Sequence, residues 1–163
     1  MTVENRLLDK ADWYFEDALT NYLYSYNLKN EELTKDDYRE IHRWAANHIG
    51  FFVTWLIQHD AKGMMSPDEE TVLQSVKNEQ ILGVDYLLDW CDGKLGTMDV
   101  KKDFQDFVNN YYEHQYMKDY SEFVVNDLYD LPLEFLGSWE DYHLFAPVID
   151  QAYADYLAGK RFH

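Results

Sequence analysis

The stretch Lys35–His59, KDDYREIHRWAANHIGFFVTWLIQH, decides the fold. Its apolar side chains recur at the i, i+3, i+4, i+7 spacing that places them on one face of a long helix. Thr34 precedes the stretch as an N-cap. Gly50 interrupts it at a cost of about 1 kcal/mol in helix propensity, so we expect another element to approach closely there. The apolar face comprises Ile41, Ala45, His48, Phe52, Trp55 and Leu56.

Helical patterns also fill most of the sequence around this stretch. Ser66-Pro67-Asp68-Glu69 combines a cap, a proline at the first helical position and a capping-box glutamate, which predicts a helix over 67–78. Pro147 either kinks a long C-terminal helix or begins a new one. Further helices are expected over 9–27, 84–90, 99–118 and 148–157, whereas 127–137 is expected to be a loop or a short extended segment. The sequence therefore predicts a mainly α, single compact domain over 1–163 with about six helices.

The charge balance restricts the partners of this chain. Its 163 residues include 31 acidic and 14 basic side chains, which gives a formal net charge of −17. Such a chain is repelled by the phosphates of nucleic acids and by anionic membrane surfaces. The charge indicates either a solvated surface or a surface that binds a basic protein.

The single cysteine and the N-terminus favour the cytoplasm. Cys91 has no partner for an internal disulfide, which fits a reducing compartment. Its place at a predicted helix end, beside acidic residues, indicates a small buried residue and not a nucleophile. The N-terminal residues lack the pattern of a signal peptide, and the apolar runs are too short to span a bilayer.

Acidic and aromatic residues alternate in the last third of the chain. Residues 103–159 contain 12 acidic residues, 14 aromatic residues and a single basic residue, Lys118. Most of the rings recur at helical spacing and are expected in the core, which leaves the carboxylates and a few rings to bind a partner. The candidate partner-binding residues are Asp119, Tyr120, Glu122, Asp127, Trp139 and Asp141.

No pattern in the sequence points to a defined chemistry. Glu140 and His143 form a single E-x-x-H pair, whereas a di-iron site needs this pair twice, so neither a metal nor a cofactor is predicted. His48 is expected to be buried, neutral and hydrogen-bonded, with a general base as the alternative. A pocket lined by tryptophan and histidine is the enzyme or ligand-binding alternative, and its candidate residues are Trp13, His48, Trp55 and Tyr120.

A set of short segments resembles an uncharacterised family of small bacterial proteins that is described only as a domain of unknown function. The chain departs from the family pattern at Tyr14, where members carry a histidine, and in an apparent insertion over 21–34. The resemblance implies a compact bacterial protein and no activity. The matching segments are Ala11-Asp12-Trp13-Tyr14, His48-Ile49-Gly50-Phe51-Phe52 with Trp55, Val76-Lys77-Asn78, Cys91-Asp92-Gly93-Lys94-Leu95, Phe107 with Tyr111-Tyr112, Asp119-Tyr120, and Trp139-Glu140-Asp141-Tyr142 before Val148-Ile149-Asp150.

Three classes of function remain open from the sequence. The first is a non-catalytic protein-binding module, of the immunity type that neutralises a basic toxin. The second is an enzyme or small-ligand protein that uses the pocket residues. The third is a structural or self-associating protein, since the oligomeric state cannot be read from the chain.

Overall fold

The long helix α2 (Lys35–Gln58) is the central element of the molecule, and the computed structural model describes residues 3–163 around it. The predicted helix is confirmed. Thr34 Oγ1 accepts the Asp37 backbone N–H at 3.2 Å, and the Asp37 carboxylate accepts the Thr34 N–H at 2.8 Å, so the cap forms as expected. Most of α2 from Ile41 onward is buried, because other elements cover it on several sides.

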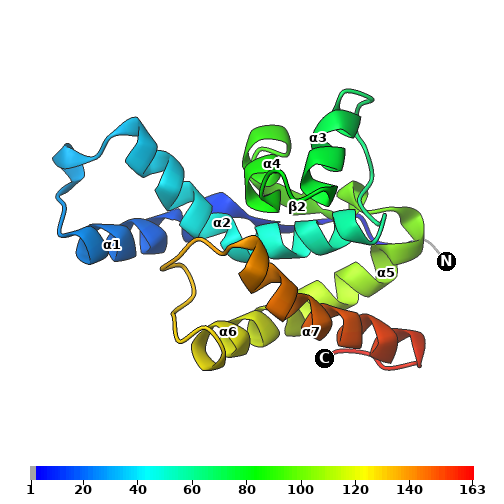
Figure 1. The fold of residues 1–163 in the computed structure, drawn as a ribbon. Coiled ribbons are helices and arrows are strands. Elements are labelled where there is room, and N and C mark those ends of the chain that lie inside the picture. Colours follow the sequence, from blue (N-terminus) through cyan, green and yellow to red (C-terminus); the bar gives the residue numbers. More distant parts are fainter. Residues whose placement is uncertain (1–2) are drawn as a thin grey trace.

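Seven α-helices, two short strands and several tight helical turns make up the described chain. Figure 1 shows α3 and α4 on one side of α2 and α5, α6 and α7 on the other, while α1 and the first half of α2 extend as an arm. The elements are β1 (Leu7–Lys10), a 3-10 turn (Ala11–Tyr14), α1 (Phe15–Tyr26), a 3-10 turn (Asn30–Glu32), α2, α3 (Glu69–Lys77), α4 (Gly83–Trp90), β2 (Lys94–Gly96), a 3-10 turn (Thr97–Asp99), α5 (Lys102–Tyr111), a π-helix (Tyr112–Tyr116), α6 (Met117–Asn126) and α7 (Trp139–Leu157).

The expected close approach at Gly50 is confirmed, and its partner is α4. A Cβ atom on Gly50 would lie 2.6 Å from Val84 Cβ and 2.8 Å from Val84 Cα. A Cβ atom on Gly83 would in turn lie 2.0 Å from Thr54 Oγ1. The two glycines therefore let the backbones of α2 and α4 meet at a distance that no larger residue permits.

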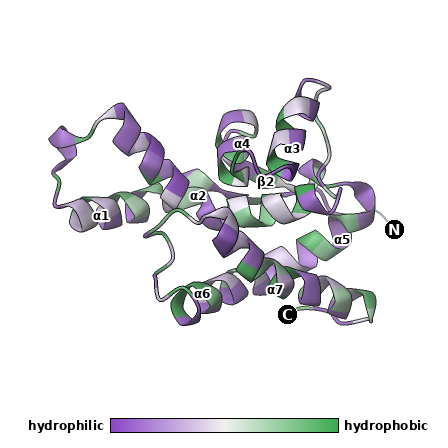
Figure 2. Ribbon diagram, in the orientation of Figure 1, coloured by the Kyte–Doolittle hydropathy of each residue, from purple (hydrophilic) through white to green (hydrophobic). Residues whose placement is uncertain are grey.

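Two apolar cores are built along α2. The larger core surrounds its second half and includes Phe52, Trp55, Tyr111 and Tyr116. The smaller core lies in the arm, where Ala18, Tyr22, Ile41, Trp44 and Ala45 pack together. Hydrophobic residues accordingly gather where the helices face each other, and hydrophilic residues lie outward (Figure 2). None of the described helices combines the length and the apolar character needed to cross a membrane.

Several predicted boundaries are wrong for identifiable reasons. The helix expected over 9–27 begins only at Phe15, because Leu7–Lys10 pairs antiparallel with Lys94–Gly96. The helix expected over 99–118 begins at Lys102, after a 3-10 turn, and the π-helix continues it into α6 as far as Asn126. The helix expected from Pro67 begins at Glu69, although the Glu69 carboxylate accepts the Ser66 N–H at 3.1 Å as a capping box requires.

The C-terminal part settles the two open points of the prediction. The segment 127–137 forms a loop without a strand in the described chain. Pro147 lies inside α7, which Ser138 caps by accepting the Asp141 N–H at 3.1 Å. Counted with the α5, π-helix and α6 segments as one continuous helical run, the fold has the mainly α character and the number of helices that the sequence predicts.

Candidate functional site

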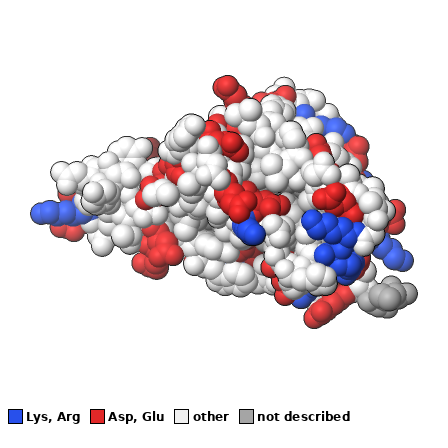
Figure 3. Space-filling model, turned by 90° about the horizontal axis from the view of Figure 1, so that it is seen from below, with Lys and Arg blue, Asp and Glu red and all other residues white. Residues whose placement is uncertain are grey.

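The surface formed by α6, the loop that follows it and the start of α7 is negatively charged. We call residues 119–144 the acidic C-terminal surface. It contains seven carboxylates and no lysine or arginine. Figure 3 views the molecule from the side of α6 and α7 and shows several acidic patches, together with clusters of lysine and arginine that lie next to some of them. The seven carboxylates belong to Asp119, Glu122, Asp127, Asp130, Glu134, Glu140 and Asp141.

No basic side chain of the described residues neutralises these carboxylates. Within residues 3–163, none of the seven forms an ion pair with a lysine, arginine or histidine. By contrast, Asp85 binds both Arg39 and Arg43, and Asp106 binds Arg161. The negative potential of the acidic C-terminal surface is therefore available to a partner.

Exposed apolar side chains lie among the unpaired carboxylates. Val125 is 46% exposed, Tyr129 is 90% exposed and Leu131 is 52% exposed. Tyr129 also has a φ angle of 54°, in the left-handed region that is costly for a residue with a bulky side chain. The left-handed backbone belongs to the turn after α6, in which the next residue, Asp130, donates its N–H to the Val124 carbonyl at 3.1 Å. The Tyr129 ring itself lies in solvent, where it can contact a partner.

The loop that carries Tyr129 is held at its C-terminal end. Asn47, which is buried on α2, accepts the Gly137 N–H at 2.8 Å and donates its amide to the Tyr120 hydroxyl at 2.7 Å. The Leu133 carbonyl accepts a hydrogen bond from Asn21 on α1 at 3.2 Å. Leu133 and Leu136 pack on the smaller core of the arm. These contacts fix the loop between the arm and α7 and leave its other residues at the surface.

The predicted partner-binding residues divide into three groups. Glu122 and Asp127 are exposed, as the prediction requires. Asp119 and Asp141 are partly buried, because Asp119 accepts the Tyr111 hydroxyl at 2.7 Å and Asp141 caps α7. Trp139 is half-buried against the larger core.

Tyr120 corrects the prediction. The prediction that Tyr120 is an exposed anchor for a partner is wrong, because its ring is only 1% exposed and packs against Phe51 and Phe145. Sequence reasoning instead missed Val125, Tyr129 and Leu131. For Tyr129 and Leu131 the signal was the absence of helical periodicity after Asn126, which removes the requirement that an apolar residue be buried, whereas Val125 lies within α6 and gave no such signal.

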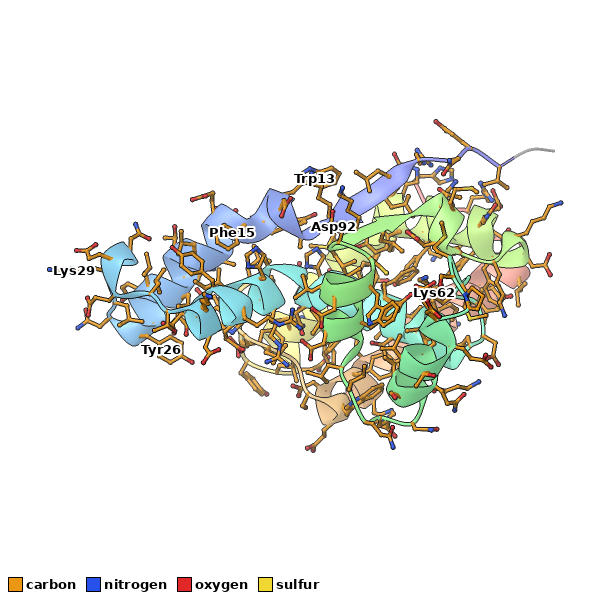
Figure 4. The ribbon with its side chains drawn as sticks, turned by 90° about the horizontal axis from the view of Figure 1, so that it is seen from above. Trp13, Phe15, Tyr26, Lys29, Lys62 and Asp92 are labelled. Atoms are coloured by element: carbon orange, nitrogen blue, oxygen red, sulfur yellow. The ribbon has the colours of Figure 1, made fainter. Side chains whose placement is uncertain are left out.

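The pocket predicted around His48 does not form from its four candidate residues. His48, Trp55 and Tyr120 are buried in the larger core or beside it, while Trp13 is 56% exposed. Figure 4 shows Trp13 at the outer edge of the molecule. Trp55 donates its indole N–H to Asp150 at 2.8 Å. Its ring also stacks on the His59 ring, with 4.1 Å between the two ring centroids. The prediction is therefore corrected: these residues stabilise the fold and do not line a common pocket.

His48 instead belongs to a buried polar cluster with Asp9. His48 Nε2 lies 3.1 Å from Asp9 Oδ2, and the same oxygen accepts the Tyr112 hydroxyl at 2.6 Å. The Tyr116 hydroxyl donates to the His48 carbonyl. Both tyrosines come from the π-helix, whose wider turn aims the two hydroxyls at β1 and α2. The cluster thus joins three elements that are distant in sequence.

The electrostatics of Asp9 favour its ionised form. Burial raises the pKa of the Asp9 carboxyl, but the hydrogen bond and the charge interaction with His48, together with the hydrogen bonds from Tyr112 and Tyr14, outweigh burial, so this pKa lies below its ordinary value of 3.8. His48 Nδ1 is buried without a hydrogen-bond partner among the described residues.

The cluster is poorly placed for general-base chemistry. His48 is 0% exposed. A cavity of about 220 Å³ beside it is lined by Asp9, Tyr14 and Tyr112 but not by His48. Because the imidazole is out of reach of a molecule in this cavity, the geometry supports a structural role for the Asp9–His48 pair.

The remaining candidates are the Glu140–His143 pair and Cys91. His143 Nε2 contacts the Glu79 carboxylate, and Glu140 is exposed. Among residues 3–163, no group of three histidine, cysteine or carboxylate side chains is arranged to hold a metal ion. Burial raises the pKa of the Cys91 thiol, which opposes formation of a thiolate.

A comparison with protein-family models places this chain. The model described as "Domain of unknown function (DUF7832)" matches residues 7–132. The chain belongs to this family. Neither the curated proteins nor the solved structures yielded a match. The DUF7832 match runs from β1 through α6 to the loop that carries Tyr129, and it ends before α7. It therefore contains the arm, the Asp9–His48 cluster and the first half of the acidic C-terminal surface.

Proposed function

We propose that this DUF7832 protein is a non-catalytic protein-binding module whose acidic C-terminal surface binds a basic protein. The proposal includes a bacterial, cytoplasmic protein of the immunity type, which would neutralise a basic toxin by covering its functional surface. The observation that carries the proposal is Tyr129, whose ring is 90% exposed on a backbone with a φ angle of 54°, on a surface whose seven carboxylates form no ion pair within the described residues.

Charged and apolar side chains of this surface would have different roles in binding. The exposed carboxylates of Glu122 and Asp127 attract a lysine- or arginine-rich surface and orient it during the encounter. Tyr129 and Leu131 supply apolar area that loses water when the partner arrives. An aromatic ring surrounded by charges is a common arrangement for the energetic centre of an interface and its polar rim.

The first prediction concerns the salt dependence of this complex. A partner captured on the immobilised chain from a lysate of its native cells at low salt should be basic. Its affinity, measured after purification by isothermal titration, should fall about tenfold between 50 mM and 500 mM sodium chloride, because salt screens exposed charges.

The association rate should carry most of this loss, since long-range attraction acts mainly on the encounter. A control titration in which sucrose replaces the added salt should leave the affinity unchanged. The proposal fails if no partner is captured at low salt, or if the captured partner binds with the same affinity at both salt concentrations.

A further inference from the structure

A cavity of about 200 Å³ lies at the other side of the molecule from the acidic C-terminal surface, between α3 and the end of α2. Lys62, which lines this cavity, pairs with Val100 in an isolated antiparallel bridge. The Ala61 carbonyl accepts the Lys101 N–H at 2.8 Å, and the Asp99 carbonyl accepts the Gly63 N–H at 2.8 Å. This pairing brings two lysines to one cavity. Figure 4 shows Lys62 beside α3, far from the arm that carries Tyr26 and Lys29.

The cavity concentrates the scarce positive charge of the protein. Three of the 14 basic residues, Lys62, Lys77 and Lys101, line it, together with the two acids Asp60 and Glu70. Lys77 Nζ binds Asp60 at 2.7 Å, whereas Lys62 and Lys101 have no carboxylate within 4.0 Å among the described residues. The lining therefore carries a net positive charge in a chain whose total charge is −17.

Lys62 is the unusual member of this group. It is 5% exposed and the only buried lysine or arginine in the described chain. Its ammonium group donates to the Gly63 carbonyl at 2.8 Å and lies 5.3 Å from the centroid of the Tyr86 ring. An ammonium group has three donors, and one of the three has a hydrogen-bond acceptor among the described residues. Lys62 therefore has donors left for a ligand in the cavity that it lines.

We propose that this cavity binds a small monocarboxylate with a short apolar chain. Ile57, Met64 and Leu73 offer the apolar part of the lining, and Lys77 and Lys101 offer ammonium groups for a carboxylate. A single negative charge fits better than two, because the repulsion from the acidic protein increases with the charge of the ligand. On binding, the carboxylate of the ligand replaces water at the ammonium group of Lys101, or replaces water or Asp60 at the ammonium group of Lys77. No covalent step is involved.

The test is a titration of the full-length protein with acetate, butyrate and inorganic phosphate, followed by NMR at constant ionic strength. Butyrate is expected to shift the amide signals of Lys62, Leu73 and Lys101 with a dissociation constant in the millimolar range or tighter, and to bind more tightly than acetate or phosphate. Lys101→Gln should weaken butyrate binding about fivefold, which is the upper range for an exposed ion pair.

Lys118→Gln is the matched control. Lys118 is also exposed and unpaired in the described chain but lies on α6, so this variant should bind butyrate like the wild type. Both positions are exposed, and both variants are expected to fold. The proposal is overturned if butyrate causes no saturable shift at the cavity, if phosphate binds more tightly than butyrate, or if the two variants lose affinity equally. None of these outcomes depends on a protein partner of the acidic C-terminal surface.

Discussion

The Asp9→Ala variant is expected to lose about 3 to 5 kcal/mol of unfolding free energy at pH 7. The Asp9 side chain is 2% exposed and accepts hydrogen bonds from His48 and Tyr112. Alanine leaves the donor groups of His48 and Tyr112 buried without an acceptor. These groups have lost their hydrogen bonds to water on folding and gain no other hydrogen bond in return. Urea denaturation followed by tryptophan fluorescence measures this change.

The destabilisation should depend on pH in a defined direction. The pKa of the Asp9 carboxyl is lower in the folded protein than its ordinary value of 3.8, so the ionised group stabilises the fold at pH values above about 4. This contribution is lost as the pH falls below 3.8 and through the folded-state pKa. The difference between wild type and Asp9→Ala should therefore shrink on acidification from pH 5 toward pH 3.

Asp9→Asn is the control for this experiment. Asparagine keeps the shape of the side chain and an acceptor for His48, so the variant should recover part of the stability at pH 7. Without a titratable group, it should lack the pH-dependent contribution of Asp9. An Asp9→Ala variant as stable as the wild type, or a difference that stays constant from pH 7 to pH 3, would contradict the structural role of the cluster.

The Gly50→Ala variant is the second large effect, with an expected loss of about 3 kcal/mol or more. Alanine improves helix propensity by about 1 kcal/mol, but its Cβ would lie 2.8 Å from the backbone Cα of Val84, so α4 must move. The cost of that movement exceeds the gain in propensity. Thermal and urea denaturation of the variant measure the balance.

Gly63→Ala is the matched control for Gly50→Ala. The nearest atom to a Cβ on Gly63 is the Asp99 carbonyl oxygen at 3.5 Å, which is an ordinary contact. This variant should remain within about 1 kcal/mol of the wild type, because a glycine in a compatible conformation tolerates alanine. If Gly50→Ala is as stable as Gly63→Ala, α2 and α4 do not meet as closely as described.

The sequence predicted the elements whose signals are local. The apolar periodicity and the Thr34 cap predicted the position of α2. Gly50 within this helix predicted that another element packs closely against it, but the sequence did not show that this element is α4. The two strands could not be predicted, because Leu7–Lys10 is stabilised by Lys94–Gly96, more than 80 positions away in the chain. Short strands of this kind carry no periodicity long enough to distinguish them from a helix end.

The candidate site was predicted less well than the fold. Periodicity assigns a residue to a face of a helix, but in a tyrosine-rich segment the buried and exposed faces look alike. Tyr120 was therefore misplaced at the surface. Tyr129 was missed because its position depends on the turn after α6, in which Asp130 donates its N–H to the Val124 carbonyl, and a turn of this kind has no periodic signal in the sequence. The hydrogen-bond partner of His48 could not be predicted either, because Asp9 lies 39 positions away in the sequence.

The most direct test of the proposed function compares the affinity of the captured basic partner for three variants by isothermal titration at 50 mM sodium chloride. Tyr129→Asn removes the exposed ring and suits the left-handed backbone, so stability should be kept while affinity falls roughly 30-fold. Glu122→Gln combined with Asp127→Asn should weaken binding about tenfold. Asp68→Asn combined with Glu70→Gln makes the same change of charge at exposed positions by α3, on the opposite side of α2 (Figure 1), and should leave binding almost unchanged. A partner that binds all three variants like the wild type, or that loses equal affinity with both double variants, would contradict the assignment of the acidic C-terminal surface as the binding site.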